Sequence, residues 1–125
     1  MAKIVHFEIP SENFEKAKSF YSNVFGWKFK QWGDMPYYMT ESGPKEHPGI
    51  EGALTTKAGN NQNVVNTLGV ENIDNTMKEI KANGGQLITE KMPIPTIGWL
   101  VYFKDPDGNA VQILNWTDDP EKPTG

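Results

Sequence analysis

Few residues of this chain could do chemistry near neutral pH. His6 and His47 are its only two histidines, and it contains no cysteine. These 125 residues can therefore form no disulfide, zinc ribbon, iron–sulfur cluster or thiol nucleophile. His6 alternates with Glu8 along a segment typical of a β-strand, which places both side chains on one face. A histidine beside a carboxylate could bind a divalent cation, or act as a general base that the carboxylate orients.

Other polar side chains lie on further predicted strands. If the strand faces follow the alternation of residues, five of them converge in one cleft: His6, Glu8, Glu51, Thr67 and Gln112. Trp99 and Tyr102 fall on opposite faces of one strand, so one of them points into the cleft, with Tyr37, Tyr38 or Met39 beside it. An apolar cavity with a few polar anchors is the usual form of a small-molecule site. The alternative is a half-buried His6 that only bonds a strand neighbour such as Glu8.

The first half of the chain predicts the order β-α-β-β-β. Apolar residues at helical spacing indicate an amphipathic helix over 13–24, which begins at a capping Asn13 and ends at Gly26. We expect this helix to enter the core through Phe14, Tyr21, Val24 and Phe25. Strands are predicted at 3–9, 27–32, 37–41 and 50–56.

The second half predicts the same order. Asn72 caps a second helix, which Gly84 and Gly85 end. Residues 92–95, two of which are prolines, are expected to break the strand predicted at 86–89. Residues 105–108 form a tight turn rich in aspartate, proline and glycine. Strands are predicted at 64–70, 86–89, 99–103 and 110–116.

The two halves form an internal repeat. A shift of 59 residues, the distance from Asn13 to Asn72, also places Gly26 on Gly85. The chain is therefore predicted to be one domain over residues 1–119. Its parts are module 1 (3–57), module 2 (64–116) and a polar tail (117–125).

Several motifs carry a family resemblance. They are the Phe-Tyr…Phe-Gly-Trp helix end within 17–27, Asp-Pro-Asp-Gly-Asn at 105–109, and Pro-Ile-Pro before Gly-Trp within 93–99. Segments 5–9 and 82–85 add to them. Over roughly residues 3–116, the chain resembles the vicinal oxygen chelate superfamily, and most of all its small glyoxalase-related members. That superfamily includes glyoxalase I, bleomycin-resistance proteins and extradiol dioxygenases.

The resemblance implies an α+β fold in which two βαβββ modules form a curled, open-barrel sheet around a cleft. It also implies homodimers, and a divalent metal that substrate oxygens chelate. His6 matches the first metal-ligand position of the family and Gln112 the last, while Glu51 lies near a third. The fourth position falls on Val65, which cannot bind metal. The predicted metal set is thus His6, Glu51 and Gln112, and the predicted catalytic set is His6, Glu8 and Gln112.

The leading functional prediction is an enzyme, or a former enzyme, that acts on a small carbonyl-type metabolite with a degraded metal site. If it is catalytic, lyase, isomerase or dioxygenase-like chemistry is expected. Val65 and Gln112 argue against glyoxalase I activity, which needs a metal and a carboxylate base. One alternative is a metal-free protein that binds or sequesters a small molecule, of the bleomycin-resistance kind. Another is a ligand-sensing interaction domain.

Composition narrows the expected partners. The net charge is −4, and all twelve basic residues are lysines. The lack of arginine counts against nucleic-acid recognition and against bidentate binding of carboxylates or phosphates. No apolar run approaches the ~18 residues of a membrane-spanning helix. We therefore expect a cytoplasmic protein that binds a small molecule and neither nucleic acid nor membrane.

Overall fold

The structure, a computed structural model, describes residues 2–57 and 63–117, which form two compact units. The first unit is His6–Val65, and the second joins residues 2–5 to residues 66–117. Both units contain strands and a helix in the order that the sequence predicts, so the α+β class with two βαβββ modules is confirmed. Among the described residues, no helix is long and apolar enough to cross a membrane.

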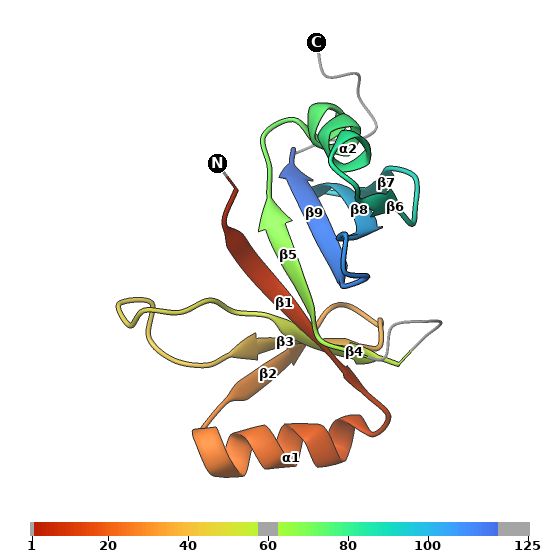
Figure 1. Cartoon of the computed structure of the whole chain (residues 1–125). Helices are drawn as coiled ribbons and strands as arrows, with labels where there is room; N and C mark the ends of the chain where they lie inside the picture. The colour runs from red at the N-terminus through yellow and green to blue at the C-terminus, as the bar shows by residue number, and fades with distance from the viewer. Residues whose placement is uncertain (1, 58–62, 118–125) are drawn as a thin grey trace. The chain divides into compact units, whose positions relative to one another are not determined.

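The first unit holds a four-stranded arrangement in the order β2-β3-β4-β1 (Figure 1). β1 runs parallel to β4, whereas β3 is antiparallel to both β2 and β4. The parallel pair follows from the helix between the first two strands, because parallel strands need a long connection. The elements are β1 (Ile4–Ser11), α1 (Phe14–Phe25), β2 (Lys28–Gln31), β3 (Tyr37–Glu41) and β4 (Ala53–Thr56).

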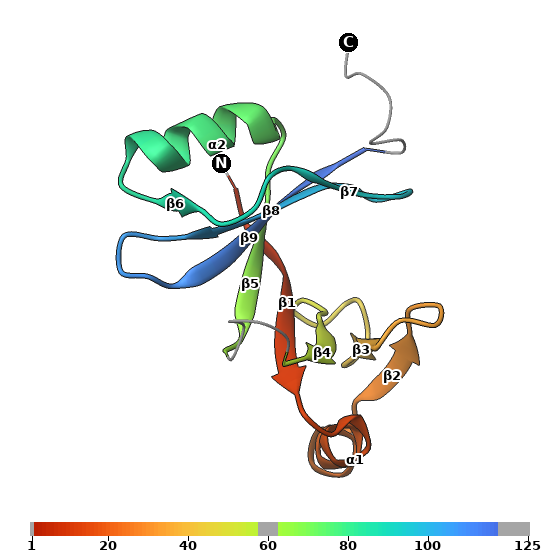
Figure 2. The ribbon, with the colours of Figure 1, turned by 90° about the vertical axis from the view of Figure 1, so that its right-hand side faces the viewer.

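The second unit repeats this plan in the order β5-β9-β8-β6, with β7 also paired to β8. β5 and β9 are parallel, and the other pairs are antiparallel. Figure 2 shows α2 lying along one side of these strands. The elements are β5 (Val65–Gly69), α2 (Ile73–Ala82), β6 (Gln86–Leu87), β7 (Met92–Ile94), β8 (Gly98–Lys104) and β9 (Ala110–Trp116).

Both helices begin as predicted and end differently. The side chains of Asn13 and Asn72 each accept a hydrogen bond from the backbone N–H three residues later, at 3.1 Å. α1 ends at Gly26, whose φ of 74° is left-handed and suits glycine. The left-handed glycine after α2 is Gly84, with φ 91°, one residue before the position that the repeat predicts.

The side of α1 that enters the first unit is narrower than predicted. The Phe14 ring lies 4.9 Å from that of Tyr38, and Tyr21 stacks on Trp27 at 4.7 Å. Val24 and Phe25 were expected in the core, but 58% and 59% of their surface is exposed. The prediction for these two was wrong because only the side of the helix that carries Phe14 and Tyr21 faces the strands.

The second unit has the larger apolar core, on the side of its sheet that faces α2. Ile73, Val101, Phe103 and Ile113 are buried together. The partly buried residues packed around them are Leu68, Val70, Met77, Ile80, Leu87, Trp99 and Val111. Along β5, β8 and β9, the residues that alternate with these core residues therefore have their side chains on the opposite face of the sheet.

The predicted break at residues 92–95 was wrong in part, because Met92–Ile94 forms β7 and pairs with β8. An edge strand tolerates proline, since its outward N–H is not needed by the sheet. The turn between β7 and β8 contains Thr96 with φ 68°, a left-handed conformation that strains a β-branched residue.

Candidate functional site

His6 lies on β1 in a half-buried position, on the same strand face as Glu8. Its imidazole Nε2 is 2.6 Å from the hydroxyl oxygen of Tyr37 on β3. The strand register places both side chains on one face of the sheet, because Tyr37 is level with Thr55, and Thr55 is level with Pro10, which shares the His6 face of β1. The two rings also lie nearly parallel, with an interplanar angle of 17°.

The surroundings of His6 favour its neutral form. Burial lowers the pKa of the imidazole below its ordinary value of 6.5, while Glu8 and a hydrogen bond to the main chain of Glu51 oppose the shift. Nε2 and the Tyr37 hydroxyl share one hydrogen bond, and the tautomer of the ring sets its direction.

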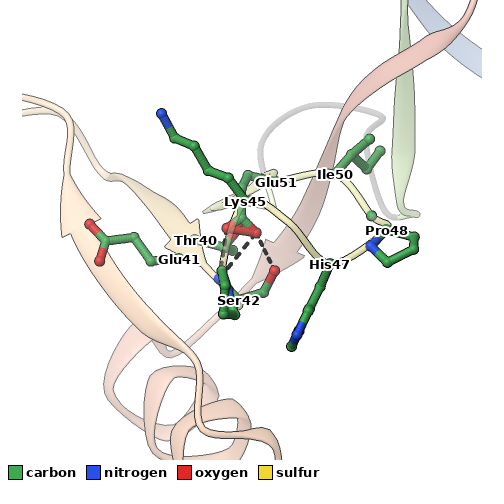
Figure 3. A pocket seen from close by; sticks show the side chains of 11 residues that line it. Thr40, Glu41, Ser42, Lys45, His47, Pro48, Ile50 and Glu51 are labelled. Atoms are coloured by element: carbon green, nitrogen blue, oxygen red, sulfur yellow. Dashed lines mark hydrogen bonds between the residues drawn. The ribbon is translucent and has the colours of Figure 1, made fainter.

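The carboxylate of Glu51 points elsewhere. It accepts hydrogen bonds from the backbone N–H of Ser42, at 2.6 and 3.1 Å, and from the Ser42 hydroxyl (Figure 3). Thr40 Oγ1 lies 3.4 Å from the same carboxylate. Residues 40–45 and 47–51 line a pocket, but the side chains of Lys45 and His47 point away from this carboxylate in Figure 3. The pocket therefore has no convergent set of charged side chains.

A second polar group lies in the second unit, on the sheet face opposite α2. Thr67 on β5, Gln112 on β9 and Tyr102 on β8 are level with one another in the strand register. Thr67 and Gln112 each expose only 2% of their surface, and the Thr67 hydroxyl donates to Gln112 Oε1 at 2.5 Å. Two buried polar side chains thus satisfy each other inside the sheet.

The predicted site residues fall into separate groups. His6 and Glu8 share a face in the first unit, and Thr67, Gln112 and Tyr102 share a face in the second. Convergence of the two groups in one cleft stays a prediction.

Tyr38 and Trp99, both predicted to line the cleft, contact the helix sides of their units instead. On β3, Tyr37 is the tyrosine that reaches His6, and its neighbour Tyr38 packs against α1. Alternation along Tyr37–Glu41 was the available signal, but it does not say which of its two faces belongs to His6.

The donor set does not fit a divalent metal of the kind that the family implies. Val65 is apolar and fully buried at one ligand position. The Nε2 of His6 already faces Tyr37, and the Glu51 carboxylate is held by Ser42. Within residues 2–57 and 63–117, no group of three or more His, Cys, Asp or Glu side chains could hold a metal ion. A site of this kind needs three or four protein ligands.

Comparisons with solved structures show the same fold at low sequence identity. A hypothetical protein from Bacillus halodurans C-125 is 15% identical with a TM-score of 0.67, and the match covers 97% of this chain and 99% of that one. Methylmalonyl-CoA epimerase from Mycobacterium tuberculosis is 10% identical with a TM-score of 0.65, covering 91% and 87%. A glyoxalase/bleomycin resistance protein/dioxygenase superfamily member from Vibrio splendidus 12B01 is 17% identical with a TM-score of 0.64, covering 94% and 100%.

No curated protein sequence matches this chain significantly. The family model described as Glyoxalase/Bleomycin resistance protein/Dioxygenase superfamily matches residues 3–113, which is most of the chain. The family resemblance predicted from the motifs is thereby confirmed. The chain belongs to the Glyoxalase/Bleomycin resistance protein/Dioxygenase superfamily.

Proposed function

We propose that this protein is a former metalloenzyme that binds a small carbonyl-type molecule without a metal, through the strand face that carries His6 and Tyr37. The observation that carries the proposal is the 2.6 Å contact between His6 Nε2 and the Tyr37 hydroxyl, which occupies the ring nitrogen that a metal would need. The buried Val65 at another ligand position supports the same conclusion.

The chemistry of this face suits an uncharged, polar ligand. A histidine with a lowered pKa is neutral at pH 7, and the tyrosine beside it can exchange hydrogen bonds with a carbonyl or hydroxyl oxygen. The chain has no arginine to hold a carboxylate or phosphate in a bidentate manner. A few polar groups of this kind, set among apolar ones, can fix the orientation of a small molecule.

Matched pairs of probes test the proposal. Acetophenone with 1-phenylethanol, and acetone with 2-propanol, are uncharged pairs that differ only in whether the oxygen is a carbonyl. We expect a carbonyl probe to shift the backbone NMR signals of His6 and Tyr37 in a saturable way, and Tyr37→Phe to weaken this binding. Tyr38→Phe is the matched control because Tyr38 packs against α1. Equal binding by both variants, or no saturable shift with any probe, would contradict the proposal.

Metal binding is tested separately. Purified protein is incubated with Ni²⁺, Zn²⁺, Mn²⁺ or Fe²⁺, and bound metal and thermal stability are then measured. We expect no stoichiometric uptake. One metal ion per chain that raises the melting temperature in wild type, and is lost in His6→Ala, would show that the site is intact.

A second candidate is a metal-free enzyme that moves a proton next to a carbonyl group. The neutral His6 in contact with the Tyr37 hydroxyl favours it, because such a pair can accept and return a proton. With acetone in D₂O, the base would remove a methyl proton and solvent deuterium would replace it. Proton NMR should show a loss of the methyl signal that His6→Gln abolishes. An exchange rate equal to that of buffer alone would exclude this activity toward acetone.

The family resemblance also implies a homodimer, and we propose a cytoplasmic location. Sedimentation of the purified chain tests the dimer, and we expect twice the mass of 14.0 kDa.

A further inference from the structure

Thr55 carries a hydroxyl on the strand face of His6 and Tyr37. It is level with Tyr37 across the antiparallel pair β3–β4, and with Pro10 across the parallel pair β1–β4. Directly opposite residues of an antiparallel pair have their Cβ atoms about 4.5–5.5 Å apart, on the same side of the sheet. The Thr55 side chain therefore lies beside the start of the Tyr37 side chain, on the face that the proposed function uses.

The Thr55 hydroxyl is available to a ligand. Thr55 is half-buried, and no hydrogen bond within residues 2–57 and 63–117 involves its side chain. In the same residues, no buried side-chain oxygen or nitrogen lacks a partner, so the Thr55 oxygen is in contact with solvent. A hydroxyl can both donate and accept, so it can pair with a carbonyl or a hydroxyl oxygen of a ligand.

Polar groups thus lie at both ends of the Tyr37 side chain. Thr55 is beside its Cβ end, and at its far end the Tyr37 hydroxyl lies 2.6 Å from His6 Nε2. The contact with His6 passes over β4, which lies between β1 and β3. On this face β4 also carries Ala53, which is fully buried and has only a methyl side chain. A ligand that lies along the Tyr37 ring would meet a polar group at each end and apolar atoms between them.

We propose that Thr55 is a third ligand-binding residue of this face, and that the preferred ligand is a flat aromatic carbonyl compound with a second oxygen para to the carbonyl group. The carbonyl binds at His6 and Tyr37, and the second oxygen exchanges a hydrogen bond with Thr55. The aromatic ring of the ligand lies along the Tyr37 ring, an arrangement that offset stacking favours. The proposal rests on the proposed function in treating His6 and Tyr37 as the ligand-binding pair.

Two probes that differ only at the para position test the role of Thr55. 4-Hydroxyacetophenone and 4-methylacetophenone carry para groups of similar size, a hydroxyl and a methyl. Their affinities are measured from the saturable shifts of backbone NMR signals of the full chain. We expect wild type to bind the hydroxyl compound roughly fivefold more tightly, the effect of about one ordinary hydrogen bond. Thr55→Val replaces the hydroxyl with a methyl group and should abolish this preference.

Thr56→Val is the matched control. Thr56 follows Thr55 on β4 and lies on the opposite face with Leu54, which is level with Tyr38 on the side of α1. This variant should keep the wild-type preference. Thr55→Ser keeps the hydroxyl and should keep most of the preference as well. A preference that survives in Thr55→Val, or that is lost in Thr55→Ser, would overturn the proposal.

A measurement on wild type keeps the test decisive if Thr55→Val does not fold. With 4-hydroxyacetophenone bound, nuclear Overhauser contacts should join the Thr55 methyl group to the ring protons beside the ligand hydroxyl. They should also join the His6 ring to the ketone methyl group. The reversed pattern, or contacts to Thr56 in place of Thr55, would overturn the proposal.

The outcomes separate this proposal from the proposed function. If Tyr37→Phe weakens acetophenone binding but wild type binds both para probes equally, Thr55 does not bind the ligand and the proposed function stands. If Thr55→Val abolishes the preference while Tyr37→Phe leaves acetophenone binding unchanged, Thr55 binds the ligand and the proposed function fails. If no aromatic carbonyl compound binds wild type, both are wrong.

Discussion

The Nε2 atom of His6 lies 2.6 Å from the hydroxyl oxygen of Tyr37, a residue 31 positions further along the chain. The contact joins β1 to β3 across the intervening β4. It gives each side chain a partner in a partly buried place, where an unpaired polar group is costly.

Removal of the Tyr37 hydroxyl should therefore destabilise the protein. We expect Tyr37→Phe to lower the free energy of unfolding by about 1 kcal/mol, because His6 loses a hydrogen bond in a partly desolvated position. Urea unfolding followed by circular dichroism measures this difference. Tyr38→Phe, which keeps its ring against Phe14, should cost less. A larger loss in Tyr38→Phe would argue against the His6–Tyr37 contact.

The lowered pKa of His6 predicts a pH dependence of stability. Burial favours the neutral imidazole, so the pKa of His6 is lower in the folded state than in the unfolded chain. Between pH 6.5 and that lower pKa, the unfolded chain therefore binds more protons than the folded one. Stability should therefore fall as the pH drops below 6.5, and this loss is complete below the folded pKa. Glu8 and Glu51, the groups that oppose the shift, limit its size.

This pH effect is checked by melting temperatures of wild type, His6→Gln and His47→Ala at several pH values. His6→Gln should flatten the slope just below pH 6.5, because glutamine does not titrate. His47→Ala should keep it. Identical slopes in wild type and His6→Gln would show that other groups dominate.

The buried Thr67–Gln112 hydrogen bond predicts a non-additive pair of mutations. Thr67→Val should cost about 1–3 kcal/mol, because it removes the donor to a buried amide oxygen. Gln112→Leu should cost a similar amount by removing the acceptor. The double variant should cost less than the sum of the single ones, since neither partner is then left behind. Strict additivity in chemical unfolding would mean that the two residues act independently.

Thr96 offers a stabilising substitution. Its φ of 68° costs roughly 1–2 kcal/mol in a residue with a β-carbon, and glycine avoids most of this cost. Part of the gain is offset because glycine is more flexible in the unfolded chain. We expect Thr96→Gly to raise the free energy of unfolding by about 1 kcal/mol. Thr89→Gly is a contrasting control that should destabilise, because the Thr89 hydroxyl accepts the Tyr102 N–H. A loss of stability in Thr96→Gly would show that the backbone conformation of Thr96 is not strained.

Features set by neighbouring residues were predictable. The caps at Asn13 and Asn72 and the left-handed Gly26 depend on contacts within a few residues, so they can be identified without a structure. The break predicted at 92–95 failed because a tertiary contact, the pairing with β8, outweighed the local effect of proline. The prediction that Val24 and Phe25 enter the core was wrong, because packing against the sheet decides which side of the helix is buried. The spacing of apolar residues along the helix does not decide it.

The sequence by itself determined the class of this protein: the repeated βαβββ order and the superfamily. These depend on local patterns and residue identity. Only the tertiary structure decided that Tyr37 rather than Tyr38 reaches His6, and that the Glu51 carboxylate holds Ser42 while its main chain contacts the histidine. The physical reason is register. Alternation puts side chains on two faces, but pairing with strands distant in the sequence decides which face meets which residue.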